Sequence, residues 1–140
     1  MWLAHTYSFK YLNSKGEGEH MELNFEKLNE GKNFKLNCEG FEEFMIDDKP
    51  NEQLGGAHYI FKFPNGYGAS VIKHIGSYGF SEDLWELAAI KFETDLSEAM
   101  HKPDDWRIIR ILELDLDIEG YLTDERVREL LNDIKNYEGC

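Results

Sequence analysis

Every second residue between Glu113 and Glu119 is a carboxylate. On a β-strand, alternate side chains lie about 6.6–6.8 Å apart along one face. One DNA strand carries a phosphate every ~3.4 Å of helix axis, so such a row matches every second phosphate. The apolar residues between the carboxylates would then face the core. We call this row the acidic ladder, and it consists of Glu113, Asp115, Asp117 and Glu119.

The acidic ladder has two interpretations. It could occupy a channel that a partner protein uses for DNA, with nearby carboxylates extending the anionic field, namely Asp104, Asp105, Asp124 and Glu125. Alternatively, its carboxylates are the solvated outer face of an edge strand, where charge also discourages aggregation.

Charge is distributed unevenly along the chain. The 140 residues have a net charge of −13, and residues 81–140 hold seventeen Asp and Glu against seven Lys and Arg. A field of this sign repels nucleic acid and acidic membranes and attracts basic surfaces. We therefore expect no direct binding to nucleic acid or membrane. The expected partner is a protein with a basic nucleic-acid-binding surface.

A second acidic cluster lies between residues 39 and 52, around the apolar residues of Phe41–Ile46. Aromatic anchors surrounded by charge are typical of binding surfaces. A strand edge with its apolar side buried explains the pattern equally. The carboxylates of this cluster that we select as candidate partner-binding residues are Glu42, Glu43, Asp47 and Asp48.

No arrangement in the sequence is typical of a catalytic or metal site. The acidic ladder lacks the glycine and the distal glutamate of an EF-hand loop. The five histidines lack metal-ligand spacings such as His-Glu-x-x-His. Ser70 and His74 would lie about 13 Å apart on a strand, too far for a nucleophile and its base. We expect a protein that is not an enzyme and holds no metal or cofactor.

The first part of the chain reads as short strands joined by polar turns. Hydrophobic residues make up 41% of the sequence, which is enough for a packed core. Period-two alternation predicts strands at Thr6–Tyr11 and Met21–Glu26, with further candidates at Phe34–Cys38 and Phe41–Ile46. Residues 47–56 carry Pro50 and paired glycines and read as a surface loop.

A hairpin is predicted from Tyr59 to Ile72, closing at Asn65-Gly66, the dipeptide that a two-residue turn prefers. That closure pairs Phe63 with Gly68 and puts three aromatic residues on one face. Two later strands are predicted at Leu84–Phe92, where a helix is the alternative, and at Trp106–Ile118.

The clearest helix begins after Thr123, which is a good N-cap. Its apolar residues fall at i, i+3, i+4 and i+7 and form one stripe that should pack on the sheet. They are Val127, Leu130, Leu131 and Ile134. The predicted fold class is α+β, a mainly antiparallel β-sheet with a C-terminal helix packed on it. We predict one domain over 1–140, with a β-rich part at 1–55 and a second part at 56–140.

Four motifs in the second part carry a resemblance: Gly56–Ile72, the Gly-Ser-Tyr-Gly turn at 76–79, Leu84–Ala88 and Gly120–Thr123. Together they resemble a family of small uncharacterised proteins of bacteriophages and prophages. The resemblance implies a phage-encoded protein in the cytoplasm of a host bacterium. This location agrees with a sequence that has no signal peptide and no apolar run of ~20 residues.

By analogy with small acidic phage inhibitors, we expect the protein to inhibit a host defence enzyme that binds nucleic acid. A CRISPR effector is one example, and the inhibitor would occupy its basic site. The alternative is a phage accessory or assembly protein that self-associates through the Tyr59–Ile75 hairpin or through Phe41–Ile46.

Overall fold

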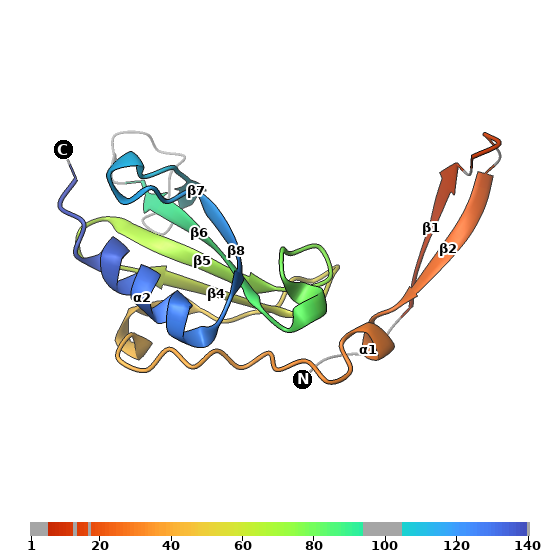
Figure 1. The fold of residues 1–140 in the computed structure, drawn as a ribbon, viewed down its shortest axis with the longest axis horizontal. Helices are drawn as coiled ribbons and strands as arrows, with labels where there is room; N and C mark the ends of the chain where they lie inside the picture. The colour runs from red at the N-terminus through yellow and green to blue at the C-terminus, as the bar shows by residue number, and fades with distance from the viewer. Residues whose placement is uncertain (1–5, 13, 17, 94–104, 140) are drawn as a thin grey trace.

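The computed structural model describes residues 6–12, 14–16, 18–93 and 105–139 (Figure 1). It has the predicted α+β fold, an antiparallel sheet with a C-terminal helix packed on one face. The strands are β1 (Thr6–Leu12), β2 (Gly18–Asn24), β3 (Met45–Asp47), β4 (Ala57–Lys62), β5 (Tyr67–Lys73), β6 (Trp85–Phe92), β7 (Trp106–Ile108) and β8 (Ile118–Leu122). The helices are α1 (Phe25–Leu28) and α2 (Asp124–Lys135), with 3-10 turns η1 (Glu42–Phe44), η2 (Phe80–Glu82) and η3 (Leu112–Leu114).

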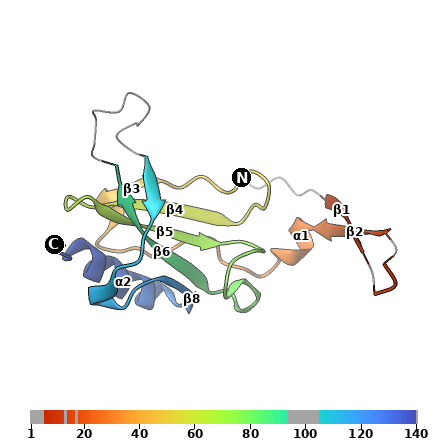
Figure 2. The same cartoon turned by 90° about the horizontal axis from the view of Figure 1, so that it is seen from above.

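Within the described residues, the main sheet has the strand order β3-β4-β5-β6-β7, and β8 also pairs with β6. The strands β7 and β8 share the outer edge of β6, because β7 pairs with Ile90–Phe92 and β8 pairs with Trp85–Ala88. The β1–β2 hairpin forms a separate two-stranded sheet that projects away from the main sheet (Figures 1 and 2).

The α2 helix confirms the prediction made from its apolar stripe. The Thr123 side chain accepts a hydrogen bond from the backbone N–H of Arg126 and so caps the helix. The four stripe residues, from Val127 to Ile134, are buried against one face of the sheet. Burying each of these side chains contributes about 1.5–3 kcal/mol, so the stripe supplies much of the free energy that holds α2 on the sheet.

The hairpin between β4 and β5 forms, but its predicted register is wrong by one residue. Phe61 pairs with Ala69 and Lys62 with Gly68, and the Phe63 N–H bonds the Tyr67 carbonyl. The turn therefore has three residues, and Gly66 takes the positive φ of 88°. Pro64 explains the difference, because its fixed φ suits the first turn position and leaves only the last position left-handed.

The predicted strand at Leu84–Phe92 is confirmed as β6, whereas the predicted strand Trp106–Ile118 is wrong. Trp106–Ile108 forms β7 on β6 and Ile118 begins β8 on the same strand, but between them the chain makes a tight loop closed by Ile111 and Leu116. Two hydrogen bonds of 2.9 and 3.1 Å between those residues close the loop, and Asp115 takes a φ of 49° inside it. Aspartate tolerates this left-handed conformation better than most residues do.

Two predicted strands before the main sheet are also corrected. Phe34–Cys38 is extended but pairs with no strand, because side chains satisfy its backbone. Phe41–Ile46 begins with η1, and only its end enters β3. The earlier strands are confirmed as β1 and β2, with α1 beginning at Phe25.

Candidate partner-binding face

The acidic ladder does not exist as a row on one strand. Glu113 lies in η3, Asp115 is the left-handed residue that follows it, and Glu119 lies on β8. The apolar partners of the ladder do not share one side either. Leu116 is 2% exposed, whereas Leu112 is 71% and Ile118 is 44% exposed. The phosphate-like spacing expected for a flat strand is therefore absent.

The loop that contains Glu113, Asp115 and Asp117 lies beside α2. The Tyr137 hydroxyl, just past the end of the helix, donates a 3.0 Å hydrogen bond to Oε2 of Glu113. Glu113, Asp115 and Asp117 are all exposed, and Glu119 is half-buried beside the β6 pairing. Three of the four predicted ladder residues thus lie on an exposed loop next to the helix.

The segment 37–44 lies along another side of α2. Arg128 donates a 2.8 Å hydrogen bond to the Asn37 carbonyl, and the Asn37 N–H donates to Asp124. Farther along the helix, Lys135 stands over the rings of Phe41 and Phe44 at 5.8 and 5.5 Å. The helix therefore carries one acidic segment on each flank (Figure 1).

Exposed carboxylates from these three segments gather around the helix. We call them the acidic face, and its residues are Glu39, Glu42, Glu43, Glu113, Asp115, Asp117, Glu125, Glu129 and Asp133. The basic side chains of α2 are engaged within the molecule. Arg126 pairs with Glu129 at 3.2 Å, Arg128 bonds a carbonyl and Lys135 covers two rings. The nine carboxylates outnumber these three cations, one of which neutralises Glu129 of the face itself, so the face keeps a net negative charge.

The remaining predicted site residues lie elsewhere. Asp47 and Asp48 are exposed at the end of β3, and Asp47 accepts a hydrogen bond from the Lys49 N–H. Asp105 is half-buried just before β7, and Asp104 lies outside the described residues. The sequence-predicted residues therefore do not form a single group.

The aromatic residues of the second cluster are part of the core and do not project as anchors. Phe41 is 8% exposed and Phe44 is half-buried, and both rings make edge contacts with Phe63. Ile46 alone is largely exposed among the apolar residues of this cluster, at 45%. The surface character of this region comes from its carboxylates.

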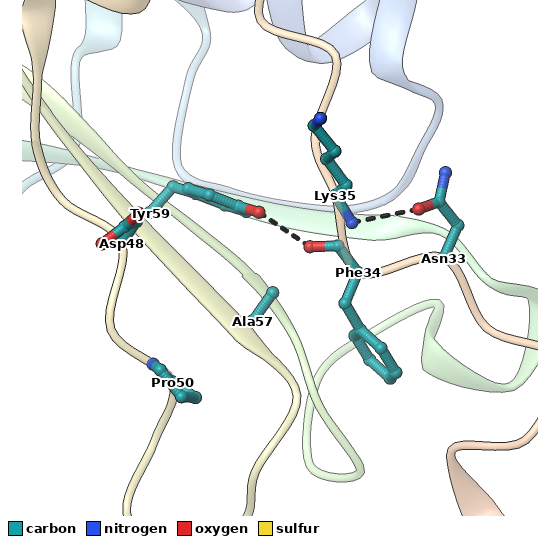
Figure 3. Close-up of a pocket in the computed structure, with 7 residues that line it drawn as sticks. All are labelled: Asn33, Phe34, Lys35, Asp48, Pro50, Ala57 and Tyr59. Carbon is teal, nitrogen blue, oxygen red and sulfur yellow. Dashed lines mark hydrogen bonds between the residues drawn. The ribbon is translucent and has the colours of Figure 1, made fainter. Parts of the chain in front are cut away.

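A groove opens between the extended segment 33–39 and the chain at 42–50 (Figure 3). Two adjoining hollows of about 440 and 460 Å³ form it, and they share Lys35, Asp48 and Tyr59. Figure 3 shows the Tyr59 hydroxyl turned towards the Phe34 carbonyl, to which it donates a 2.7 Å hydrogen bond. We call this feature the Tyr59 groove.

The groups that could react inside the Tyr59 groove are in their neutral forms. Burial raises the pKa of the Tyr59 hydroxyl above 10.0, so it remains a donor at neutral pH. Burial and the nearby Glu42 charge raise the pKa of the Cys38 thiol above 9.0. A protonated, buried thiol is a poor nucleophile, so the groove is better suited to binding than to covalent chemistry.

Sequence reasoning missed a histidine–serine pair. His58 Nε2 and Ser70 Oγ lie 2.8 Å apart on the sheet face opposite α2. The predicted hairpin register paired Ser70 with Phe61, which put Ser70 and His58 on opposite faces of the sheet. The observed register is shifted by one residue and pairs Ser70 with Ile60, so the two side chains share a face. Ser70 is 8% exposed and packs among apolar residues, so the bond satisfies two polar groups inside the sheet face.

Within the described ranges, no three His, Cys, Asp or Glu side chains are grouped so that they could hold a metal ion. Across the same ranges, no helix combines the length and apolar character needed to cross a bilayer. Comparisons of the chain with models of protein families, with curated proteins and with solved structures found no match.

Proposed function

We propose that this is an acidic binding protein, encoded by a phage, that occupies the basic nucleic-acid site of a host defence enzyme in the bacterial cytoplasm. A CRISPR effector is the type of target we favour. The observation that carries the proposal is the acidic face, nine exposed carboxylates from three segments around one helix. It replaces the flat ladder expected from the sequence with a wider anionic surface.

The physical basis is electrostatic complementarity. Nucleic-acid sites of proteins are lined with Lys and Arg that hold phosphates. An anionic surface of matching extent steers itself to such a site and excludes the nucleic acid that binds there. Surface charges separated from their partners by more than about 8 Å are screened at physiological salt, so binding should weaken as salt rises.

The proposal is tested by capturing partners from a bacterial lysate at low and high salt. The variant Glu43→Lys/Asp117→Lys/Asp133→Lys reverses one exposed carboxylate in each segment of the acidic face. The control Glu30→Lys/Glu52→Lys/Glu82→Lys makes the same change in net charge at exposed residues outside it. We expect the first variant to lose the captured enzyme and the control to retain it. Equal capture by both variants would contradict the proposal.

Self-association is the second candidate, and exposed apolar residues on the face opposite α2 favour it. Ile108 and Ile118 pair with Ile90 and Ala88 of β6 on that face and are 53% and 44% exposed. Light scattering after size exclusion separates the candidates. A stable oligomer that does not respond to salt, and that Ile108→Lys/Ile118→Lys disrupts, would favour self-association.

A further inference from the structure

We infer that the Tyr59 groove binds an extended, arginine-bearing segment of the partner protein. This inference rests on the proposed function and gives it a definite docking position. The groove adjoins the acidic face, since Glu39 and Glu42 belong to both. A partner that covers the face can therefore reach the groove with a neighbouring segment.

The walls of the groove are partly apolar. Leu36 is buried, and Met45 and Tyr59 are half-buried along its length. Such walls suit the methylene stem of a long side chain, which buries its apolar part while its charged head reaches a polar rim. A short acidic or hydroxyl side chain would gain nothing from these contacts.

The rim of the groove selects a cation. Three exposed carboxylates line it, those of Glu39, Glu42 and Asp48, against the one ammonium of Lys35. A guanidinium binds carboxylates through two parallel hydrogen bonds and is less strongly hydrated than an ammonium. Arginine is therefore favoured over lysine.

The shape of the groove favours an extended chain. One wall is itself the extended segment 33–39, whose backbone bonds to the side chains of Tyr59 and Asp124 and leaves the segment outside the sheet. A guest chain that runs extended along this wall would advance about 3.3 Å per residue, and its alternate side chains would project in the same direction. Two arginines at alternate positions can thus reach the rim together.

The test uses the full chain and a defined peptide, acetyl-Ala-Arg-Val-Arg-Ala-amide, titrated by NMR at about 25 mM salt, where surface charges are weakly screened. We expect the amide signals of residues 33–39 and 45–50 to shift. A peptide with citrulline, the neutral counterpart of arginine, should bind roughly tenfold more weakly, because both charge pairs are lost. No shift with the arginine peptide would overturn the inference.

The matched variants identify the rim. Glu39→Gln/Glu42→Gln/Asp48→Asn should lower the affinity for the arginine peptide roughly tenfold. Lys35→Gln should raise that affinity about two- to fivefold, because it removes the cation that competes for the rim carboxylates. The control Glu30→Gln/Glu52→Gln/Glu82→Gln makes the same net charge change at exposed residues outside both the groove lining and the acidic face, and should bind as the wild type does. Equal weakening by the rim variant and the control would overturn the inference.

The inference and the proposed function fail separately. If the rim variant still captures the enzyme at wild-type strength and the acidic-face variant does not, the groove is not the docking position and the proposed function stands. If neither variant changes capture, the proposed function falls as well. Circular dichroism of each variant checks that it is folded.

Discussion

The indole N–H of Trp85 donates a 2.6 Å hydrogen bond to Oδ1 of Asp124, the first residue of α2. The other carboxylate oxygen accepts from the backbone N–H of Asn37 at 3.2 Å. One side chain thus joins the sheet, the helix and the extended wall of the Tyr59 groove. The acidic face and the groove depend on this junction.

We predict that Asp124→Ala lowers the free energy of unfolding by about 2–4 kcal/mol. The change removes two hydrogen bonds and leaves the buried indole donor without its acceptor. Urea denaturation measures the loss. Glu125→Ala, one residue farther along the same helix turn, is the control and should stay within about 1 kcal/mol of the wild type. Equal losses would show that Asp124 is not the junction.

A second prediction concerns Lys73, which is 2% exposed and lies 4.2 Å from the centre of the Trp85 ring. Its ammonium donates to the Asn33 carbonyl at 2.7 Å and to Asp83 at 2.9 Å. Asp83→Ala removes the carboxylate that pairs with the buried Lys73 ammonium. We therefore expect the free energy of unfolding to fall by about 1–3 kcal/mol at pH 7. Lys73→Met/Asp83→Ala should recover part of this loss in the same urea measurement.

The Lys73–Asp83 pair also predicts behaviour in acid. Burial acts to raise the pKa of Asp83, but hydrogen bonds from Lys73 and the Asn33 N–H and the nearby lysine charges outweigh it and lower that pKa below 3.8. A lowered carboxyl pKa contributes stability above the unfolded value, and this is lost as pH falls through the folded value. The wild type and Asp83→Asn should therefore differ in stability at pH 5 and converge well below pH 3.8.

Two histidines, His58 and His74, affect stability in a different pH range. Burial lowers the pKa of His58 and of His74 below 6.5, against the opposing charges of Asp47 and Glu86. The unfolded chain then binds more protons than the folded chain below pH 6.5, so stability should fall as pH drops from 7 to 5. NMR titration of the ring protons measures both pKa values. Values at or above 6.5 would contradict the prediction.

Two glycines of the β4–β5 hairpin should respond differently to alanine. Gly66 has a positive φ and open space around it, so Gly66→Ala should cost about 1–2 kcal/mol through conformation alone. A Cβ at Gly68 would meet the Phe61 carbonyl oxygen and would lie 2.8 Å from the Phe92 ring. Gly68→Ala should cost about 3 kcal/mol or more. Thermal unfolding of both variants ranks the two costs.

The elements predicted well from sequence are those that a local period determines. The stripe from Val127 to Ile134 specifies one buried face, and the period-two pattern at 84–92 indicates a strand, although β6 is buried on both of its faces. The alternation from Glu113 to Glu119 was misleading, because a tight loop with Asp115 left-handed interrupts it without any glycine or proline as a signal. The period-two pattern does not reveal this loop, because the bridge between Ile111 and Leu116 closes it with neither glycine nor proline in between.

The candidate site was only partly predictable for a related reason. The acidic character of residues 39–48 and 113–119 is evident from composition. Their placement beside α2 depends on contacts between residues far apart in sequence, such as Arg128 with Asn37 and Tyr137 with Glu113. The Tyr59 groove is likewise formed by an extended segment that side chains hold in place, and no sequence period encodes that arrangement.

The central claim is that the acidic face displaces nucleic acid from a basic site. The most direct measurement is the fluorescence anisotropy of labelled nucleic acid bound to the captured enzyme while this protein is added. We predict that anisotropy falls to the free value, that rising salt shifts the midpoint to higher protein concentration, and that Glu43→Lys/Asp117→Lys/Asp133→Lys abolishes the displacement. Nucleic acid that stays bound while this protein also binds would contradict the account.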